Sequence, residues 1–300
     1  MEIAVRYVTR FRYRSPVWDS HNALRACPRS DDHQRSVRYE LAVEPTARLH
    51  GYVDRWGTRV DTFGVRLPHD ELVVDARASL TTEPRPSPAA SALDDLAAPG
   101  FRTDRWLFTQ PSPHTRWTPE MAAEARELVA GLDDATEVAR TVMGHVHDTM
   151  DYVPGATRIG VDPAEVWSEQ AGVCQDYAHL TISFLRSLGL PARYVSGYFY
   201  AADPADGSSP DGDEIVVQTH AWVEAAIPGF GWWGIDPTNC LEAGERHVVI
   251  GHGRDYDDVT PLRGVYHGDT DHELAVAVTM GAGRISSRPL PDVPLDAVDQ

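Results

Sequence analysis

The chain has 300 residues, of which 42% are hydrophobic and 24% are charged, a composition typical of one large or two ordinary folded domains rather than of a disordered chain. All 27 basic residues are arginine, against 45 acidic residues, and the net charge is −18. This balance argues against a nucleic acid or an anionic membrane as partner, because both are bound through a basic surface.

The first 82 residues carry strand patterns. Polar and apolar residues alternate over the segments 2–13, 35–43, 50–66 and 71–80, which are rich in Val, Tyr, Thr and Phe. Trp56-Gly57-Thr58 is typical of a hairpin turn. We therefore predict a small β-sandwich domain over 1–82. The following segment, 83–117, is rich in proline and predicts a linker or a strap across a surface.

Residues 118–280 predict a second domain in which helices precede strands. Helix signals cover 118–131, 134–150 and 174–188, and strand patterns cover 192–200, 215–227, 232–236 and 272–280. Helices that precede strands, instead of alternating with them, indicate an α+β fold with helices packed on an antiparallel sheet. We expect the acidic loop 201–214 and the tail 281–300 to be flexible.

The cysteines and the N-terminus bear on the compartment. Cys27, Cys174 and Cys240 form no CxxC pair, which argues against a disulfide framework and a zinc ribbon. The first residues alternate and lack the apolar stretch of a secretory signal, and no apolar run is long enough to span a membrane. We expect a cytoplasmic protein in which one cysteine is free to act as a nucleophile.

Cys174, His220 and Asp236 are the candidate catalytic residues. Cys174 opens a predicted helix, where unpaired N–H groups and the positive end of the helix dipole lower a thiol pKa and can face an oxyanion. His220 lies in a later strand, and Asp236 ends the next one. Cysteine, histidine and aspartate in this order are typical of papain-like cysteine enzymes.

Other polar and aromatic residues near these positions allow simpler interpretations. Asp176, in the first turn after Cys174, is predicted to be a surface carboxylate that suits the helix dipole. Gln175 and Trp222 are candidates for the substrate cleft, although helix surface and core packing explain them as well. His145 and His147 are two residues apart on a helix and do not face one ligand, so we predict no metal site there.

Four motifs in order resemble the bacterial transglutaminase-like superfamily: GVCQDYAHL, LGLPARYVSGY, THAWVEA and GWWGIDPTN. The later stretch HVVIGHGRDYDDVTPLRGVYHG resembles the C-terminal signature of that family, and residues 1–82 resemble the β domain that often precedes its core. The resemblance implies a papain-like catalytic core in which Cys174 is the nucleophile, His220 the base and Asp236 the orienting acid.

This chemistry predicts a reaction at a carbonyl carbon. A thiolate attacks an amide or ester and forms a thioester, which water or an amine then resolves, and neither a metal nor a cofactor is needed. We expect a cysteine hydrolase acting on peptide or isopeptide amides of a peptide or protein substrate. The alternatives are a transglutaminase-type acyltransferase to an amine and a non-catalytic binding module on the same fold. The sequence does not predict the oligomeric state.

The strand register makes the triad testable. A strict four-residue turn at 228–231 would place the side chains of His220 and Asp236 on opposite faces of the sheet, because side chains alternate along a strand. We therefore predict an odd-length turn or a β-bulge between 224 and 236, with the Asp236 carboxylate within hydrogen-bonding reach of the His220 ring and that ring facing Cys174.

Overall fold

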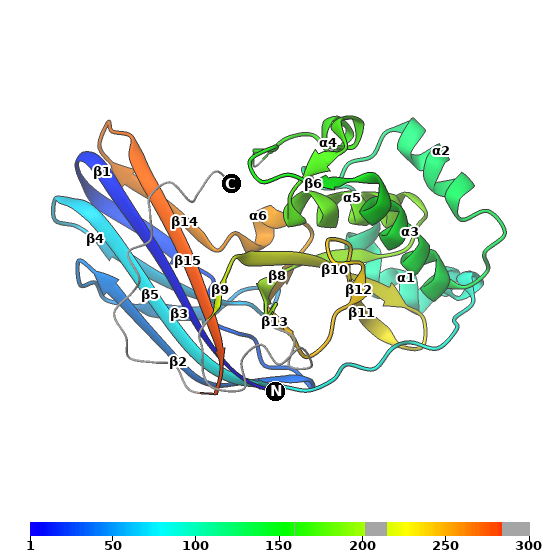
Figure 1. The fold of residues 1–300 in the computed structure, drawn as a ribbon, viewed down its shortest axis with the longest axis horizontal. Coiled ribbons are helices and arrows are strands. Elements are labelled where there is room, and N and C mark those ends of the chain that lie inside the picture. The colour runs from blue at the N-terminus through cyan, green and yellow to red at the C-terminus, as the bar shows by residue number, and fades with distance from the viewer. Residues whose placement is uncertain (159, 202–214, 284–300) are drawn as a thin grey trace.

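The computed structural model describes residues 1–158, 160–201 and 215–283. A long, twisted array of strands lies beside a second sheet that is covered by helices (Figure 1). Most of the acidic loop at 201–214 and of the tail at 281–300, both predicted to be flexible, lies outside the described residues. Among the described residues, no helix is long and apolar enough to cross a membrane.

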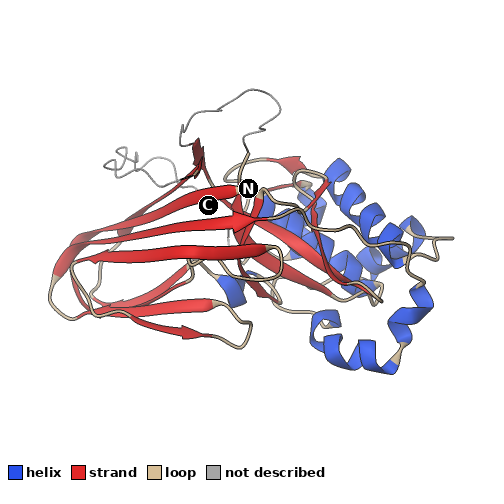
Figure 2. Ribbon diagram, turned by 90° about the horizontal axis from the view of Figure 1, so that it is seen from below, coloured by secondary structure: helices blue, strands red, loops and turns tan. Residues whose placement is uncertain are grey.

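The N-terminal domain consists of two antiparallel layers that share one long strand (Figure 2). One layer has the order β2-β5-β1-β15-β9, and β4 and β14 pair with the second half of β1 in the other. Their bounds are β1 (Glu2–Leu24), β2 (Gln34–Glu44), β3 (His50–Val53), β4 (Arg59–Val65), β5 (His69–Thr82), β9 (Ile215–Val217), β14 (Leu262–His267) and β15 (His272–Ala282). The register of β1 shifts between Arg12 and Val17, which carries its second half into the other layer.

The membership of this sheet differs from the expectation in one respect. Residues 118–280 were all predicted to belong to the second domain, whereas β14 and β15 pair with β1. The alternation along β15 predicts a strand, and local pattern does not show which sheet that strand joins. The predicted turn at Trp56-Gly57-Thr58 is confirmed: it connects β3 and β4, with Gly57 at φ 76°.

The proline-rich segment 83–117 lies against the second domain and contains short helices that its prolines do not predict. These are η1 (Leu93–Ala97), α1 (Pro99–Arg105) and η2 (Trp106–Thr109). Leu93 N–H donates to the carbonyl of Asp133, and the Ser91 hydroxyl donates to the carbonyl of Pro228. Buried Arg186 of the central helix donates to the carbonyl of Gln110, so the segment is held along its length.

The second domain has the predicted α+β architecture. Its sheet has the order β12-β11-β10-β8-β13, with a helical layer on one face. The bounds are α2 (Pro119–Leu128), α3 (Ala135–Thr149), β6 (Asp151–Tyr152), α4 (Pro163–Glu169), β7 (Ala171–Gly172), α5 (Cys174–Ser187), β8 (Ala192–Phe199), β10 (Thr219–Ile227), β11 (Gly231–Asp236), β12 (Leu241–Glu242), β13 (His247–Gly253) and α6 (Tyr256–Val259). Thr118 and Asp134 cap α2 and α3, and α4 was not predicted.

The predicted register of β10 and β11 is confirmed. Ile227 pairs with Gly231 and Ala225 with Trp233, which leaves a three-residue turn at 228–230. Gly231 has φ 110°, a conformation that suits glycine at the end of such a turn. The odd turn length places even-numbered positions of both strands on one face, so that His220 and Asp236 can meet.

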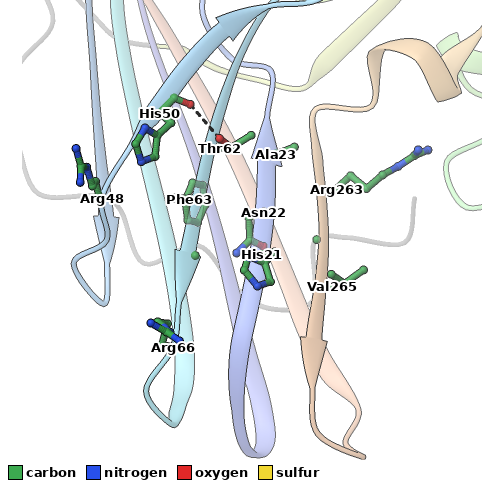
Figure 3. A pocket seen from close by; sticks show the side chains of 12 residues that line it. His21, Asn22, Ala23, Arg48, His50, Thr62, Phe63, Arg66, Arg263 and Val265 are labelled. Carbon is green, nitrogen blue, oxygen red and sulfur yellow. Dashed lines mark hydrogen bonds between the residues drawn. The ribbon is translucent and has the colours of Figure 1, made fainter.

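A groove of about 650 Å³ lies on the N-terminal domain, at the faces of β1, β4 and β14 (Figure 3). Its charged and titratable lining is basic: His21, Arg48, His50, Arg66 and Arg263. Cys174, His220 and Asp236 do not line it. The groove is therefore separate from the predicted catalytic residues.

Candidate active site

Cys174 is the first residue of α5, and its partly exposed side chain is a free thiol. The turn in front of it is fixed by Asp176, whose carboxylate accepts hydrogen bonds from Val173 N–H at 2.9 Å and from the Thr157 hydroxyl at 2.5 Å. A Cβ on Gly172 would lie 2.7 Å from the Asp176 carboxylate, so this close approach requires glycine.

The prediction that Asp176 is a surface carboxylate is wrong. The residue is 6% exposed, and its hydrogen bonds serve the entry to the helix. The backbone N–H that precedes a helix needs an acceptor, and an acidic residue at the third helical position supplies it. Burial raises the pKa of Asp176, while the hydrogen bonds from Thr157 and Val173 lower it in part.

His220 lies between Cys174 and Asp236. Its Nε2 atom is 2.8 Å from Oδ2 of Asp236, and its ring is also hydrogen-bonded to the thiol of Cys174. Because Nε2 is engaged with the carboxylate, Nδ1 is the atom that faces sulfur. Burial lowers the pKa of His220, but the hydrogen bonds to Asp236 and Cys174 outweigh burial and raise that pKa to about 10.

Asp236 is completely buried and accepts several hydrogen bonds. Its Oδ1 accepts from the backbone N–H groups of Thr238 and Asn239 at 3.0 and 3.2 Å. Its Oδ2 accepts from the Asn239 amide at 2.7 Å, in addition to His220. Burial raises the pKa of Asp236, and its hydrogen bonds with His220 and His247 hold that pKa far below the ordinary value. The carboxylate is therefore ionised and fixed in orientation.

Sequence reasoning missed a second histidine at this carboxylate. Nε2 of His247, the first residue of β13, lies 3.1 Å from Oδ2 of Asp236. The His247 ring is buried against Phe199 and Trp222, with ring centroids 4.7 and 5.1 Å away. The available signal was its place at the start of the stretch HVVIGHGRDY, but nothing in that pattern assigns it a partner.

His220, Asp236 and His247 also offer metal-ligand atoms that lie within 4.8 Å of one another. The backbone N–H of Gly244 donates to Nδ1 of His247 at 3.2 Å. A metal bound at Nε2 of neutral His247 would need the ring proton on Nδ1, where it would face that N–H donor. The donor set therefore fits hydrogen bonding better than a metal ion.

The two predicted cleft residues differ in exposure. Trp222 is 1% exposed and packs beside the His220 ring, with centroids 5.9 Å apart, so it cannot form a wall that a substrate touches. The spacing of residues in the sequence shows neither this burial nor the neighbouring strand, so it could not predict that Trp222 is enclosed. Gln175 is partly exposed in the first turn of α5 and stays a cleft prediction.

Tyr152 lies near Cys174. It belongs to β6, which pairs with β7, and β7 ends two residues before Cys174. Its side chain is 47% exposed, and its ring contacts that of Tyr177, with centroids 6.2 Å apart. Burial and the proximity of Cys174 raise the pKa of Tyr152. A half-exposed aromatic ring thus lies near Cys174, and sequence reasoning did not predict it.

The remaining cysteines and histidines lie in other environments. Cys27 is buried in the N-terminal domain, and burial raises its pKa to about 11. Cys240 is exposed in the turn after β11, and burial together with Asp148 and Asp236 raises its pKa. His145 pairs with Glu124, and the His147 ring is hydrogen-bonded to the carbonyl of Pro237, so the two rings have separate partners.

Comparisons with known proteins show the family to which the chain belongs. The family model of the transglutaminase-like superfamily matches residues 122–237, and that of the bacterial transglutaminase-like N-terminal region matches residues 3–81. The uncharacterized protein ML0607 of Mycobacterium leprae is 35% identical over 92% of this chain and 97% of its own length. The uncharacterized protein Rv2569c of Mycobacterium tuberculosis is 32% identical over 90% and 89% of the two chains.

Two further proteins carry descriptions of an activity. A protein-glutamine gamma-glutamyltransferase of Pseudomonas aeruginosa is 30% identical over 83% of this chain, which spans 37% of that protein's length. A crystal structure from Cytophaga hutchinsonii, described as a candidate cysteine protease, superposes with a TM-score of 0.72 and 19% identity over 97% of this chain and 94% of the other. The fold is the papain-like α+β core behind a β-sandwich domain. The chain belongs to the transglutaminase-like superfamily.

Proposed function

We propose that the protein is a cysteine hydrolase that cleaves peptide or isopeptide amide bonds through a thioester. One observation carries this proposal: the His220 ring is hydrogen-bonded to Cys174 on one side and to buried, ionised Asp236 on the other. Cys174 is the nucleophile, His220 the general base and acid, and Asp236 the group that orients the imidazole.

The steps follow from this geometry. Nδ1 of His220 takes the thiol proton, and the thiolate attacks the carbonyl carbon of the substrate. His220 then returns the proton to the leaving amine as the thioester forms. The N–H groups of the first residues of α5 are the donors that we expect to stabilise the oxyanion. Water, activated by the same imidazole, hydrolyses the thioester and restores the thiol.

Acyl transfer to an amine is the second candidate function. Resemblance to the gamma-glutamyltransferase of Pseudomonas aeruginosa favours it. The acyl-enzyme is the same in both reactions, and the two differ only in whether water or an amine reaches the thioester. We favour hydrolysis, with a peptide or protein amide as substrate and the cytoplasm as location, which the three free cysteines support.

Intact-mass spectrometry separates the candidates. The protein is incubated with glutamine-containing peptides, with and without a small primary amine, and Cys174→Ala is the matched control. We expect a transient acyl adduct and a shortened or deamidated peptide that are both missing from the control. Conjugation of the amine would identify an acyltransferase. A native chain that forms no adduct and no product with any peptide would favour the binding module.

A further inference from the structure

Oδ2 of Asp236 is shared by two imidazole rings. His220 approaches it to 2.8 Å and His247 to 3.1 Å, and the two ring centroids are 6.2 Å apart. His247 is 2% exposed, so it does not contact a substrate. His247 can therefore influence a reaction at Cys174 through its hydrogen bond to Asp236.

The turn before β13 fixes the protonation state of His247. Gly244 N–H donates to Nδ1 of His247, and His247 N–H donates to the carbonyl of Gly244 at 3.0 Å, so the ring closes over its own turn. Since Nδ1 accepts, the ring proton resides on Nε2 and points at Asp236. A second proton on Nδ1 would face the Gly244 N–H, which disfavours the protonated ring. Burial disfavours it too and lowers the pKa of His247.

We propose that His247 is a positioning residue, a permanently neutral donor that shares the Asp236 carboxylate with His220 and so limits how tightly Asp236 holds the protonated His220 ring. This inference rests on the proposed thiol chemistry. A carboxylate oxygen that already accepts a second N–H binds an imidazolium less strongly. His220 then stays acidic enough to protonate the leaving amine, while Asp236 still fixes its tautomer.

Among the groups around the His247 ring, Asp236 is the one through which His247 acts on His220. Phe199 and Trp222 provide apolar walls around both rings. The titratable and charged groups near the two rings are Cys174 from α5, Asp236 from β11, Cys240 from the turn after it, Arg246 beside β13, and His147 and Asp148 from α3. Within the described chain, Asp236 is the side-chain acceptor that His247 reaches.

Two amide variants separate the two halves of the His247 ring. In His247→Gln, the amide nitrogen reaches the position of Nε2 and keeps a donor on Asp236. In His247→Asn, the shorter amide keeps an acceptor near Nδ1 for Gly244 N–H and loses the reach to Asp236. Both variants are neutral and lose the ring contacts with Phe199 and Trp222, so a role of the ring in packing alone would not distinguish them in the titration of His220.

The test is the titration of His220, followed by NMR of the full-length protein with labelled histidine rings. We expect the pKa of His220 to rise by about 0.4–1 unit in His247→Asn, the worth of one hydrogen bond, and to stay near the native value in His247→Gln. For a peptide that the native protein hydrolyses, kcat should fall in His247→Asn and stay near the native value in His247→Gln, with KM unchanged in both. Equal titration of His220 in both variants and the native protein would overturn the inference.

Two further outcomes need their own interpretation: a His247→Asn variant that does not fold, and a protein that hydrolyses no peptide. If His247→Asn does not fold, His247→Leu removes the donor to Asp236 and keeps an apolar side chain against Phe199 and Trp222. We then expect the pKa of His220 to rise as in His247→Asn, and an unchanged His220 titration would contradict the inference. A His220 shift in a protein that turns over no peptide would retain the role of His247 at Asp236 and refute the hydrolase instead.

Discussion

In the proposed mechanism, each of the three residues depends on the next. The Cys174 thiol would be activated through His220, and His220 is held through Asp236, which in turn is fixed by backbone and side-chain donors. Residues that act in such a chain lose their effect together, because the nucleophile is of no use without its base.

Replacement of the nucleophile should therefore remove turnover. We expect Cys174→Ala to lower kcat at least about a thousandfold and Cys174→Ala/His220→Ala to be no worse, because the two residues act as one unit. Cys240→Ala is the matched control, since that thiol is exposed and lies outside the hydrogen bonds to His220, and it should keep native kcat. Steady-state kinetics and circular dichroism check both points, and normal turnover by Cys174→Ala would refute the assignment.

The exposed ring beside the nucleophile gives a prediction about substrate binding. We expect Tyr152→Ala to raise KM by about 2–10-fold with a smaller change in kcat, because an aromatic contact is worth about 0.5–1.5 kcal/mol. Val265→Ala on β14 is the control, because Val265 is also exposed but belongs to the N-terminal domain. An equal KM in the Tyr152 variant and the control would mean that the substrate does not touch this ring.

The sequence predicted the residues whose role follows from order and spacing and missed those that depend on tertiary contact. Cys174, His220 and Asp236 could be placed because a helix start and two successive strands bring them together. Asp176 was misassigned because its burial depends on Thr157, which comes from a preceding loop. His247 was missed because β13 reaches Asp236 only across the sheet.

At the level of elements, the turn between β10 and β11 decides the register of the site. The sequence constrained this element well, because only an odd turn lets His220 and Asp236 share a face. It constrained β1 poorly, since the alternation over 2–13 does not show that the strand continues to Leu24 and joins two layers. Helix α4 was missed because it is a short helix, at Pro163–Glu169, and short helices have little periodicity.

The same face of β10 carries a buried ion pair that should make stability depend on pH. The Glu224 carboxylate accepts a hydrogen bond from Nε of Arg193 at 2.7 Å and lies 3.3 Å from Nε2 of His252. Burial raises the pKa of Glu224, but Arg193 and His252 outweigh burial and hold it well below its ordinary value of 4.5. The ionised carboxylate therefore stabilises the fold above about pH 4.5, and this contribution is lost as the pH falls.

Glu224→Gln should remove this contribution. We expect the variant to be less stable at pH 7 by about 3–5 kcal/mol, because Arg193 stays buried without its counter-charge. The difference from the native protein should shrink as the pH falls below about 4.5. Urea unfolding at several pH values measures it, with Glu40→Gln on the exposed edge strand β2 as the control. A difference that does not change with pH would show that Glu224 is not ionised in the folded protein.

At the level of the whole molecule, the N-terminal domain and the catalytic core share one interior. A single apolar cluster contains Ile3 and Tyr7 of β1 together with Tyr198 of β8 and Val248 and Ile250 of β13. Strand β13 lies at the edge of the core sheet, and it begins at His247. The N-terminal domain therefore supports the strand that contributes the second imidazole at Asp236.

Gln34 makes this support specific. Its side-chain amide donates to the carbonyl of Val249 and accepts from the N–H of Val249, both at 2.8 Å, and so pairs with the edge of β13 as a neighbouring strand would. The residue is 2% exposed. Gln34→Leu would remove the acceptor of Val249 N–H, whereas the Val249 carbonyl would keep the hydrogen bond from Arg29 N–H at 2.9 Å. An unsatisfied buried polar group costs about 1–3 kcal/mol.

We therefore expect Gln34→Leu to lower the free energy of unfolding by about 1–3 kcal/mol while the protein still unfolds in one transition, because the shared cluster couples the two domains. Val37→Ala, an exposed change on the same strand, is the control and should stay within about 0.5 kcal/mol of native stability. Urea unfolding followed by tryptophan fluorescence and by far-UV circular dichroism tests both parts. Transitions that separate between the two probes would show that the domains unfold independently and that Gln34 stabilises only one of them.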